Sequence, residues 1–209
     1  MARRHVTLCV AALAAATGAV AASSGGAAAM KLPHPFKTAE LFPVHLGASW
    51  TFAVHAPGAA AASETWSVTR RCAEDATLLR GATGMTLRVA PAGVWGASGT
   101  PWIADPVSAG KTWSPRPGLT VRITASYVDA KVAAGKYDGC AAVTRTEVDP
   151  DTRVGEQVVT TFCPAVGPVR IVTQPLAARA PDPPATLREL TAFAPGSAAA
   201  RSADCAAAP

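Results

Sequence analysis

The chain has 209 residues, of which 49% are hydrophobic and 16% charged, and its formal net charge is +5 at pH 7. This length is sufficient for one domain with a substantial buried core. The basic residues are scattered along the chain rather than clustered in a stripe with aromatic residues between them, which argues against nucleic acid as a partner.

Residues 1–29 have the pattern of a bacterial-type secretory signal peptide. Arg3 and Arg4 form a basic start, residues 6–20 form an apolar run, and small residues with two A-x-A sequences follow. This arrangement predicts cleavage after about residue 21 or residue 29. The apolar run is shorter than the roughly 20 residues that a membrane-spanning helix needs. We therefore expect an exported protein, periplasmic or extracellular, with no integral membrane span after signal cleavage.

Residues 30–194 are predicted to form a single β domain, with one short helix over residues 37–42. Between Leu119 and Tyr127, apolar residues alternate with polar ones, which is typical of a strand with one buried and one exposed face. Further β-rich runs, separated by turn-forming residues, cover 65–70, 85–89, 141–148, 156–162, 166–173 and 186–193. This pattern favours an all-β fold, either a single curved antiparallel sheet or a partly closed β-barrel with hairpin connections.

The C-terminal residues 195–209 are rich in Ala, Ser and Pro. Such a segment buries too little apolar surface to offset the entropy lost on ordering. We expect it to be disordered unless Cys205 ties it to the domain.

A short motif occurs twice, 43–50 and 106–113, and both copies read P-V-x-x-G-x-x-W. Proline fixes φ and cannot donate to a strand ladder, so it is favoured just before a strand. Glycine allows the turn, and the tryptophan adds a large apolar side chain to the core. The motif therefore predicts two equivalent strand starts, with Trp50 and Trp113 as core residues or, alternatively, as ligand contacts.

Four of the five cysteines lie beyond the apolar run that contains Cys9. An even number of cysteines in an exported chain suggests disulfides, and three connectivities are compatible with four cysteines. Residues 147–153 contain an Asp-Pro-Asp turn whose centre lies midway between Cys140 and Cys163. A hairpin folded there would place residue 142 opposite 161 and residue 144 opposite 159, and would favour a Cys140–Cys163 disulfide. Cys72 and Cys205 would then remain as a second pair, with free thiols as the alternative.

Three segments resemble a diffuse set of uncharacterised bacterial secreted proteins and lipoproteins. Residues 41–52 are similar to the "fPLxxGxxWxY" start of these proteins, residues 134–140 to their "PAGxFxxC" segment, and residues 162–169 to their "YAxGVGxV" strand. The sequence departs from the set at Ala133, where proline is frequent, and at Cys163-Pro164, and it lacks the lipidated cysteine. The resemblance spans residues 41–193 and implies an envelope-exposed β domain, but it transfers no catalytic residues.

The chemistry-bearing side chains form no recognisable active-site pattern. The histidines His34, His45 and His55 stand at turn or leader positions, and no G-x-S-x-G sequence or phosphate-binding glycine loop occurs. The alternating Glu147, Asp149 and Asp151 are interrupted by Pro150, so they indicate a solvated hairpin tip rather than a calcium site. We therefore expect no enzyme activity, no metal and no cofactor.

Two functions fit these observations. The first is a structural or interaction module of the cell envelope, whose partner would be another envelope protein. The alternative is a carrier or chaperone that binds an apolar, lipid-like ligand in the concave face of the sheet. Trp50, Trp66 and Trp113 are the candidate ligand contacts, with core packing as their other role, and an apolar cavity would distinguish the carrier from the structural module.

Overall fold

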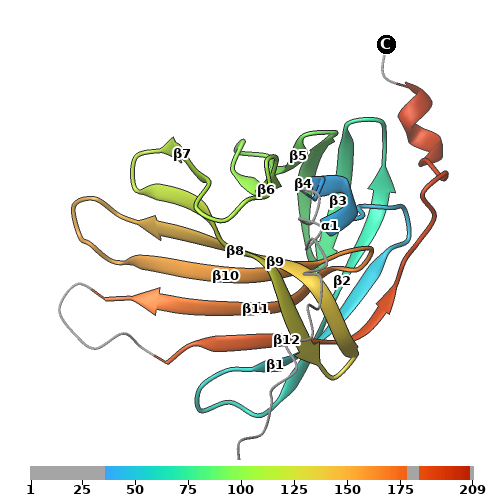
Figure 1. Ribbon diagram of the computed structural model, residues 1–209. Helices are drawn as coiled ribbons and strands as arrows, with labels where there is room; N and C mark the ends of the chain where they lie inside the picture. Colours follow the sequence, from blue (N-terminus) through green and yellow to red (C-terminus); the bar gives the residue numbers. More distant parts are fainter. Residues whose placement is uncertain (1–35, 178–183, 208–209) are drawn as a thin grey trace, which may run out of the picture. The chain divides into compact units, whose positions relative to one another are not determined.

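The computed structural model describes residues 36–177 and 184–207, so the predicted signal peptide lies outside the described residues. Twelve strands form one antiparallel sheet, which confirms the all-β fold class (Figure 1). The described elements are α1 (Thr38–Leu41), β1 (Ser49–His55), β2 (Ala62–Arg71), β3 (Asp75–Arg80), β4 (Thr83–Ala90), β5 (Gly93–Gly96), β6 (Pro101–Ala104), β7 (Thr112–Arg116), β8 (Leu119–Val132), β9 (Gly135–Val148), β10 (Gly155–Cys163), β11 (Gly167–Leu176), β12 (Thr186–Ala194) and the 3-10 helix η1 (Ala203–Ala207). No helix in these ranges is long and apolar enough to span a membrane.

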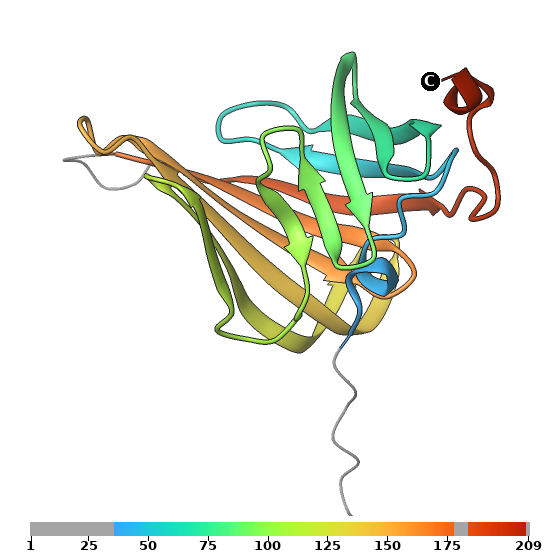
Figure 2. The same cartoon turned by 90° about the horizontal axis from the view of Figure 1, so that it is seen from above.

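The sheet consists of two meanders that meet at its centre. The strand order is β6-β5-β4-β3-β2-β1-β12-β11-β10-β9-β8-β7, so β1 pairs with β12 and every other neighbour is also the neighbour in sequence. The sheet curls into a nearly closed barrel, and the view from above shows its concave side (Figure 2). Its two edges, β6 and β7, are joined directly by the residues 105–111.

Both edge strands are built to resist pairing with another chain. β6 has four residues and begins with Pro101, and β7 has five residues and contains Pro115. Proline cannot donate a ladder hydrogen bond, and short edge strands offer few unpaired groups. The opening between the edges is therefore a poor template for an added strand.

Every predicted strand overlaps an observed one, and the predicted helix contains α1. Beyond the two strand starts predicted from the repeated motif, β3, β5 and β6 were missed because they have only four to six residues, and β5 and β6 also lie among glycines and prolines. Short strands of this kind take their stability from the neighbouring strands rather than from a local pattern.

The repeated motif does begin two strands, but its two tryptophans differ in depth. Gly47 and Gly110 adopt φ of +79° and +90°, a conformation that side chains disfavour. Trp50 is 0% exposed and its Nε1 donates a hydrogen bond of 2.6 Å to the Val166 carbonyl, whereas Trp113 is only partly buried. The same local sequence therefore produces one core anchor and one peripheral contact.

The N-terminal segment closes one side of the gap between β6 and β7. Thr38 in α1 donates hydrogen bonds to Asp105 Oδ1 from its backbone nitrogen (3.0 Å) and from its hydroxyl (2.8 Å). Asp105 directly follows β6, so these bonds attach α1 to the edge of the sheet. Leu41 and Phe42 at the end of α1 are buried and complete the core there.

The predicted hairpin and its disulfide are both present. Residue 142 pairs with 161 and residue 144 with 159, as the turn position predicted. Cys140 and Cys163 form a disulfide across a Cα–Cα distance of 4.2 Å, and both are 0% exposed. Asp149 stabilises the turn by accepting hydrogen bonds from the following backbone nitrogens at 2.9 and 2.8 Å.

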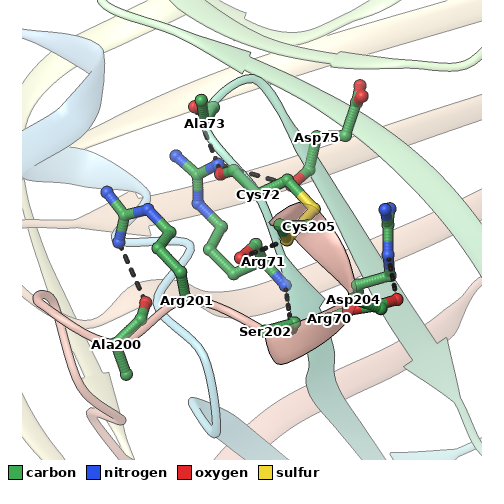
Figure 3. Close-up of a disulfide and its surroundings, with 10 residues drawn as sticks. All are labelled: Arg70, Arg71, Cys72, Ala73, Asp75, Ala200, Arg201, Ser202, Asp204 and Cys205. Atoms are coloured by element: carbon green, nitrogen blue, oxygen red, sulfur yellow. Dashed lines mark hydrogen bonds and ion pairs between the residues drawn. A yellow bond between two sulfur atoms is a disulfide. The ribbon is translucent and has the colours of Figure 1, made fainter. Parts of the chain in front are cut away.

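The second disulfide holds the C-terminal segment against β2 (Figure 3). Cys72 and Cys205 are bonded across a Cα–Cα distance of 5.4 Å. The Arg71 backbone nitrogen donates to Ser202 Oγ (2.9 Å), and the Ser202 nitrogen donates to the Arg71 carbonyl (3.0 Å). Residues 195–207 therefore have defined contacts instead of the disorder expected from their composition, because the tie through Cys205 is formed.

Candidate ligand-binding pocket

A cavity of about 360 Å³ lies on the concave face of the sheet, between the two meanders. Its walls follow the two-residue period of the strands. On β10, Glu156, Val158, Thr160 and Phe162 line the cavity, while the intervening residues lie on the other face. Equivalent alternate positions of β9, β11 and β12 line the cavity next to them.

One part of the wall is apolar and aromatic. The rings of Trp66 and Trp102 meet edge to face with their centroids 5.8 Å apart. Val158, Ile171 and Phe162 continue this surface on the opposite strands. Such a wall removes apolar ligand surface from water, which contributes roughly 25 cal/mol for each Å² buried.

The other part of the wall contains two groups of ion pairs. In the first, Glu64 Oε2 accepts a hydrogen bond from Arg188 Nε (2.7 Å), and Glu64 Oε1 accepts one from Trp66 Nε1 (2.6 Å). Arg80 lies over the face of Trp66, with its guanidinium carbon 4.5 Å from the ring centroid. These four residues come from β2, β3 and β12, so the group connects strands of both meanders.

The second group lies across the cavity on β7, β9 and β10. Arg145 Nη2 donates to Glu156 Oε1 (2.8 Å) and its Nη1 lies 3.9 Å from Glu147 Oε2. Glu147 also accepts a hydrogen bond from Arg116. These side chains are about 40–55% exposed, so water screens them more than the first group.

Burial and charge shift the ionisation of the first group. Burial raises the pKa of Glu64, but hydrogen bonds from Arg188 and Trp66 and the positive charges of Arg188 and Arg80 outweigh this effect, so its pKa lies below the usual value. Burial lowers the pKa of Arg80, and the neighbouring Arg188 and Arg145 lower it further, against the opposing effect of Glu64. Glu64 is therefore the central negative charge of this group, directly behind the pocket-lining residues Trp66, Arg80 and Arg188.

We expect Glu64→Gln to lower the free energy of unfolding at pH 7 by about 2 kcal/mol. Two arginines lose their carboxylate partner, and the hydrogen bonds that Arg188 and Trp66 donate lose a charged acceptor. Since the folded-state pKa of Glu64 is lowered, its stabilisation is complete above the unfolded-state value and is lost as pH falls through the folded-state value. Wild-type stability should therefore decline below about pH 4 more steeply than that of the variant. Urea unfolding at pH 7, 5 and 3.5 measures both effects.

Glu156→Gln serves as the control, because Glu156 is 44% exposed and pairs with a single arginine. Its loss of stability at pH 7 should be below about 1 kcal/mol. Equal losses for the two variants would contradict the central role assigned to Glu64.

Of the three tryptophans predicted from the sequence as ligand contacts, one lines the cavity and two do not. Trp66 lines the cavity. Trp50 belongs to the core and has no surface for a ligand, and Trp113 packs against the edge of the core without lining the cavity. Trp102, an alternative aromatic contact, does line it.

The charged residues of the pocket were not anticipated. Arg145 and Glu147 alternate on β9 and so share a face, which is the available signal, but the Asp-Pro-Asp turn that follows favours a solvated hairpin tip for Glu147. Arg80 and Arg188 lie in strands whose local sequence does not indicate which face points into the pocket. Within the described residues, no three His, Cys, Asp or Glu side chains are grouped so as to hold a metal ion.

Fold and site together define an all-β domain with a mixed apolar and charged pocket in the concave face of its sheet. No protein-family model matches the sequence, and no curated protein matches it either. Among solved structures, the chain is similar to a presumed exported protein from Bacteroides fragilis described as having a YmcC-like fold. The TM-score is 0.45 at 10% identity, covering 74% of this chain and 98% of that one. So distant a similarity carries no argument, and the function has to be inferred from the pocket.

Proposed function

We propose that this chain is an exported, non-enzymatic binding protein that holds a small molecule with an apolar body in its concave pocket. The observation that carries this proposal is the cavity of about 360 Å³ with its aromatic and aliphatic wall. Binding sites for small molecules occupy roughly 300–1,000 Å³ and have predominantly apolar walls with a few polar groups. A purely structural module would have no need of such a cavity.

Export is supported by two independent features. The N-terminal sequence has the organisation of a secretory signal, and the domain contains two disulfides. Disulfides persist in oxidising compartments and are rare in the cytosol. The compartment we propose is therefore the periplasm or the extracellular space.

The composition of the pocket wall also narrows the class of ligand that was expected from the sequence. A wall made only of apolar residues would suit a hydrocarbon, but here ion pairs occupy one side of the cavity. Ion pairs keep part of their hydration, so an entirely apolar ligand would leave them poorly solvated. We infer that only the body of the ligand is apolar.

Filling the cavity tests this function. In Val158→Trp the new indole would occupy the pocket, whereas in Val159→Trp the same side chain would lie on the other face of β10. We expect the wild type to bind the neutral apolar probe pyrene saturably. Val158→Trp should weaken binding by about tenfold or more, since the volume for the ligand is removed.

The measurement is a titration of pyrene emission, excited directly, on proteins whose folding is checked by circular dichroism. Val159→Trp is the matched control and should bind as the wild type does. The proposal is wrong if the wild type binds neither pyrene nor the alkyl ligands described below saturably, or if both folded variants weaken binding equally.

A further inference from the structure

Positive charge converges on the pocket from several strands. Four arginines line the cavity, together with only two glutamates, Glu147 and Glu156. The third carboxylate nearby, Glu64, pairs with two of these arginines. The arginines are Arg80 of β3, Arg116 of β7, Arg145 of β9 and Arg188 of β12.

Three of the four arginines donate a close hydrogen bond to a carboxylate, whereas the buried Nε of Arg80 makes only a longer ion pair with Glu64. Arg188 donates to Glu64, Arg145 to Glu156, and Arg116 to Glu147. Arg80 Nε is buried and makes no hydrogen bond to any described residue. It lies 3.6 Å from Glu64 Oε1, which is an ion-pair distance too long for a hydrogen bond.

Glu64 fails to satisfy Arg80 because other donors hold it. Its Oε1 receives the Trp66 indole at 2.6 Å and its Oε2 receives Arg188 at 2.7 Å, which fixes both oxygens in position. Arg80 meanwhile stacks on the face of the same indole. A guanidinium so placed is oriented by the ring, and Arg80 keeps an unsatisfied donor at Nε.

We propose that Arg80 binds the negatively charged head group of the pocket's ligand, which makes the ligand an amphipathic organic anion with a carboxylate or phosphate group. This inference rests on the proposed function. The fork of guanidinium donors matches both head groups, and the adjoining wall of Trp66 and Trp102 accepts the apolar body.

The charge balance favours the same class of ligand. Arg80 has Arg188 and Arg145 as cationic neighbours, and both lower its pKa. Glu64 is the carboxylate that opposes them at Arg80. Four arginines and three carboxylates, Glu64, Glu147 and Glu156, lie at the pocket, so an added anion would balance the remaining positive charge and a cationic head group would add to it.

The test compares ligands that share one alkyl chain and differ in the head group. Binding of dodecanoate, dodecyl phosphate, neutral dodecanol and cationic dodecyltrimethylammonium to the exported chain is measured by calorimetry, below their micelle concentrations. We expect both anions to bind about tenfold or more tightly than dodecanol, and the cation most weakly. The tighter of the two anions identifies the head group.

Arg80→Gln and Arg88→Gln are the matched variants. Arg88 also stacks on a tryptophan, 4.9 Å from the Trp95 ring centroid, but neither Arg88 nor Trp95 lines the pocket. Arg80→Gln should reduce the affinity for the anions about tenfold and leave dodecanol unchanged, while Arg88→Gln changes neither. Arg80→Gln should also fold, because Glu64 keeps its hydrogen bonds from Arg188 and Trp66 in this variant.

Two results separate the inference from the function on which it rests. If dodecanol and the anions bind equally and Val158→Trp blocks them all, the anionic head group is refuted and the apolar pocket stands. If no alkyl ligand and no pyrene binds saturably, both proposals fail. Equal losses of anion affinity in Arg80→Gln and Arg88→Gln would also overturn the role of Arg80.

Discussion

Replacing Trp50 with alanine is expected to lower the free energy of unfolding by about 3–5 kcal/mol. Trp50 is fully buried, and its ring lies 5.8 Å from that of Phe42 and 5.7 Å from that of Phe193. Truncation removes these contacts, leaves a cavity, and deprives the Val166 carbonyl of a hydrogen-bond donor. Urea unfolding followed by far-ultraviolet circular dichroism measures the loss.

Trp113→Ala is the natural control, because Trp113 occupies the same position of the repeated motif. Its side chain is only partly buried at the edge strand β7, so we expect a loss of about 1–2 kcal/mol. If the two substitutions cost the same, the motif itself, rather than the depth of the side chain, would determine the stability at these positions.

Removing the Cys140–Cys163 disulfide is expected to cost roughly 3 kcal/mol in the chain-entropy model. The bond joins residues separated by 23 positions, one within β9 and the other at the end of the paired strand β10. Both cysteines are fully buried, so the double substitution Cys140→Ala/Cys163→Ala removes the crosslink and leaves small apolar side chains in the core. Denaturant unfolding of the double variant and the wild type gives the difference.

In the same model the Cys72→Ala/Cys205→Ala double variant should lose more stability, roughly 5 kcal/mol, because its crosslink spans 133 positions. The segment that it fastens makes mostly exposed hydrogen bonds outside the sheet, so this loss would come from the unfolded chain and not from an opened strand ladder. A loss no larger than that of the Cys140–Cys163 variant would contradict this prediction.

Local sequence predicted the hairpin of β9 and β10 well because the turn determines the register of the two strands. The local sequence could not predict which of Trp50 and Trp113 is more deeply buried, because their motifs share the same four defining residues. Their burial differs because Trp50 is in a central strand and contacts Phe42 beside α1, whereas Trp113 is in an edge strand. Depth in a sheet depends on neighbours that are remote in sequence.

The pocket was beyond local prediction for the same reason. Its first ion-pair group joins Glu64 to Arg188, which are 124 positions apart, and brings Arg80 from a third strand. Charged residues on a strand are normally assigned to the exposed face. Only the curling of the sheet turns these particular positions toward one another, so the alternating pattern alone could not distinguish a pocket wall from a wet surface.

Because the two meanders meet at the centre of the sheet, the strand order also determines the sequence separation of the residues that must pair during folding. Ten of its strand pairings connect strands that follow each other along the chain, and one, β1 with β12, joins Ser49 to Ala194. Contacts between residues that are far apart in sequence slow folding. In this topology the longest such contacts belong to a single strand pairing, that of β1 with β12. The sheet therefore becomes continuous only when β12, near the end of the chain, pairs with β1 near its start.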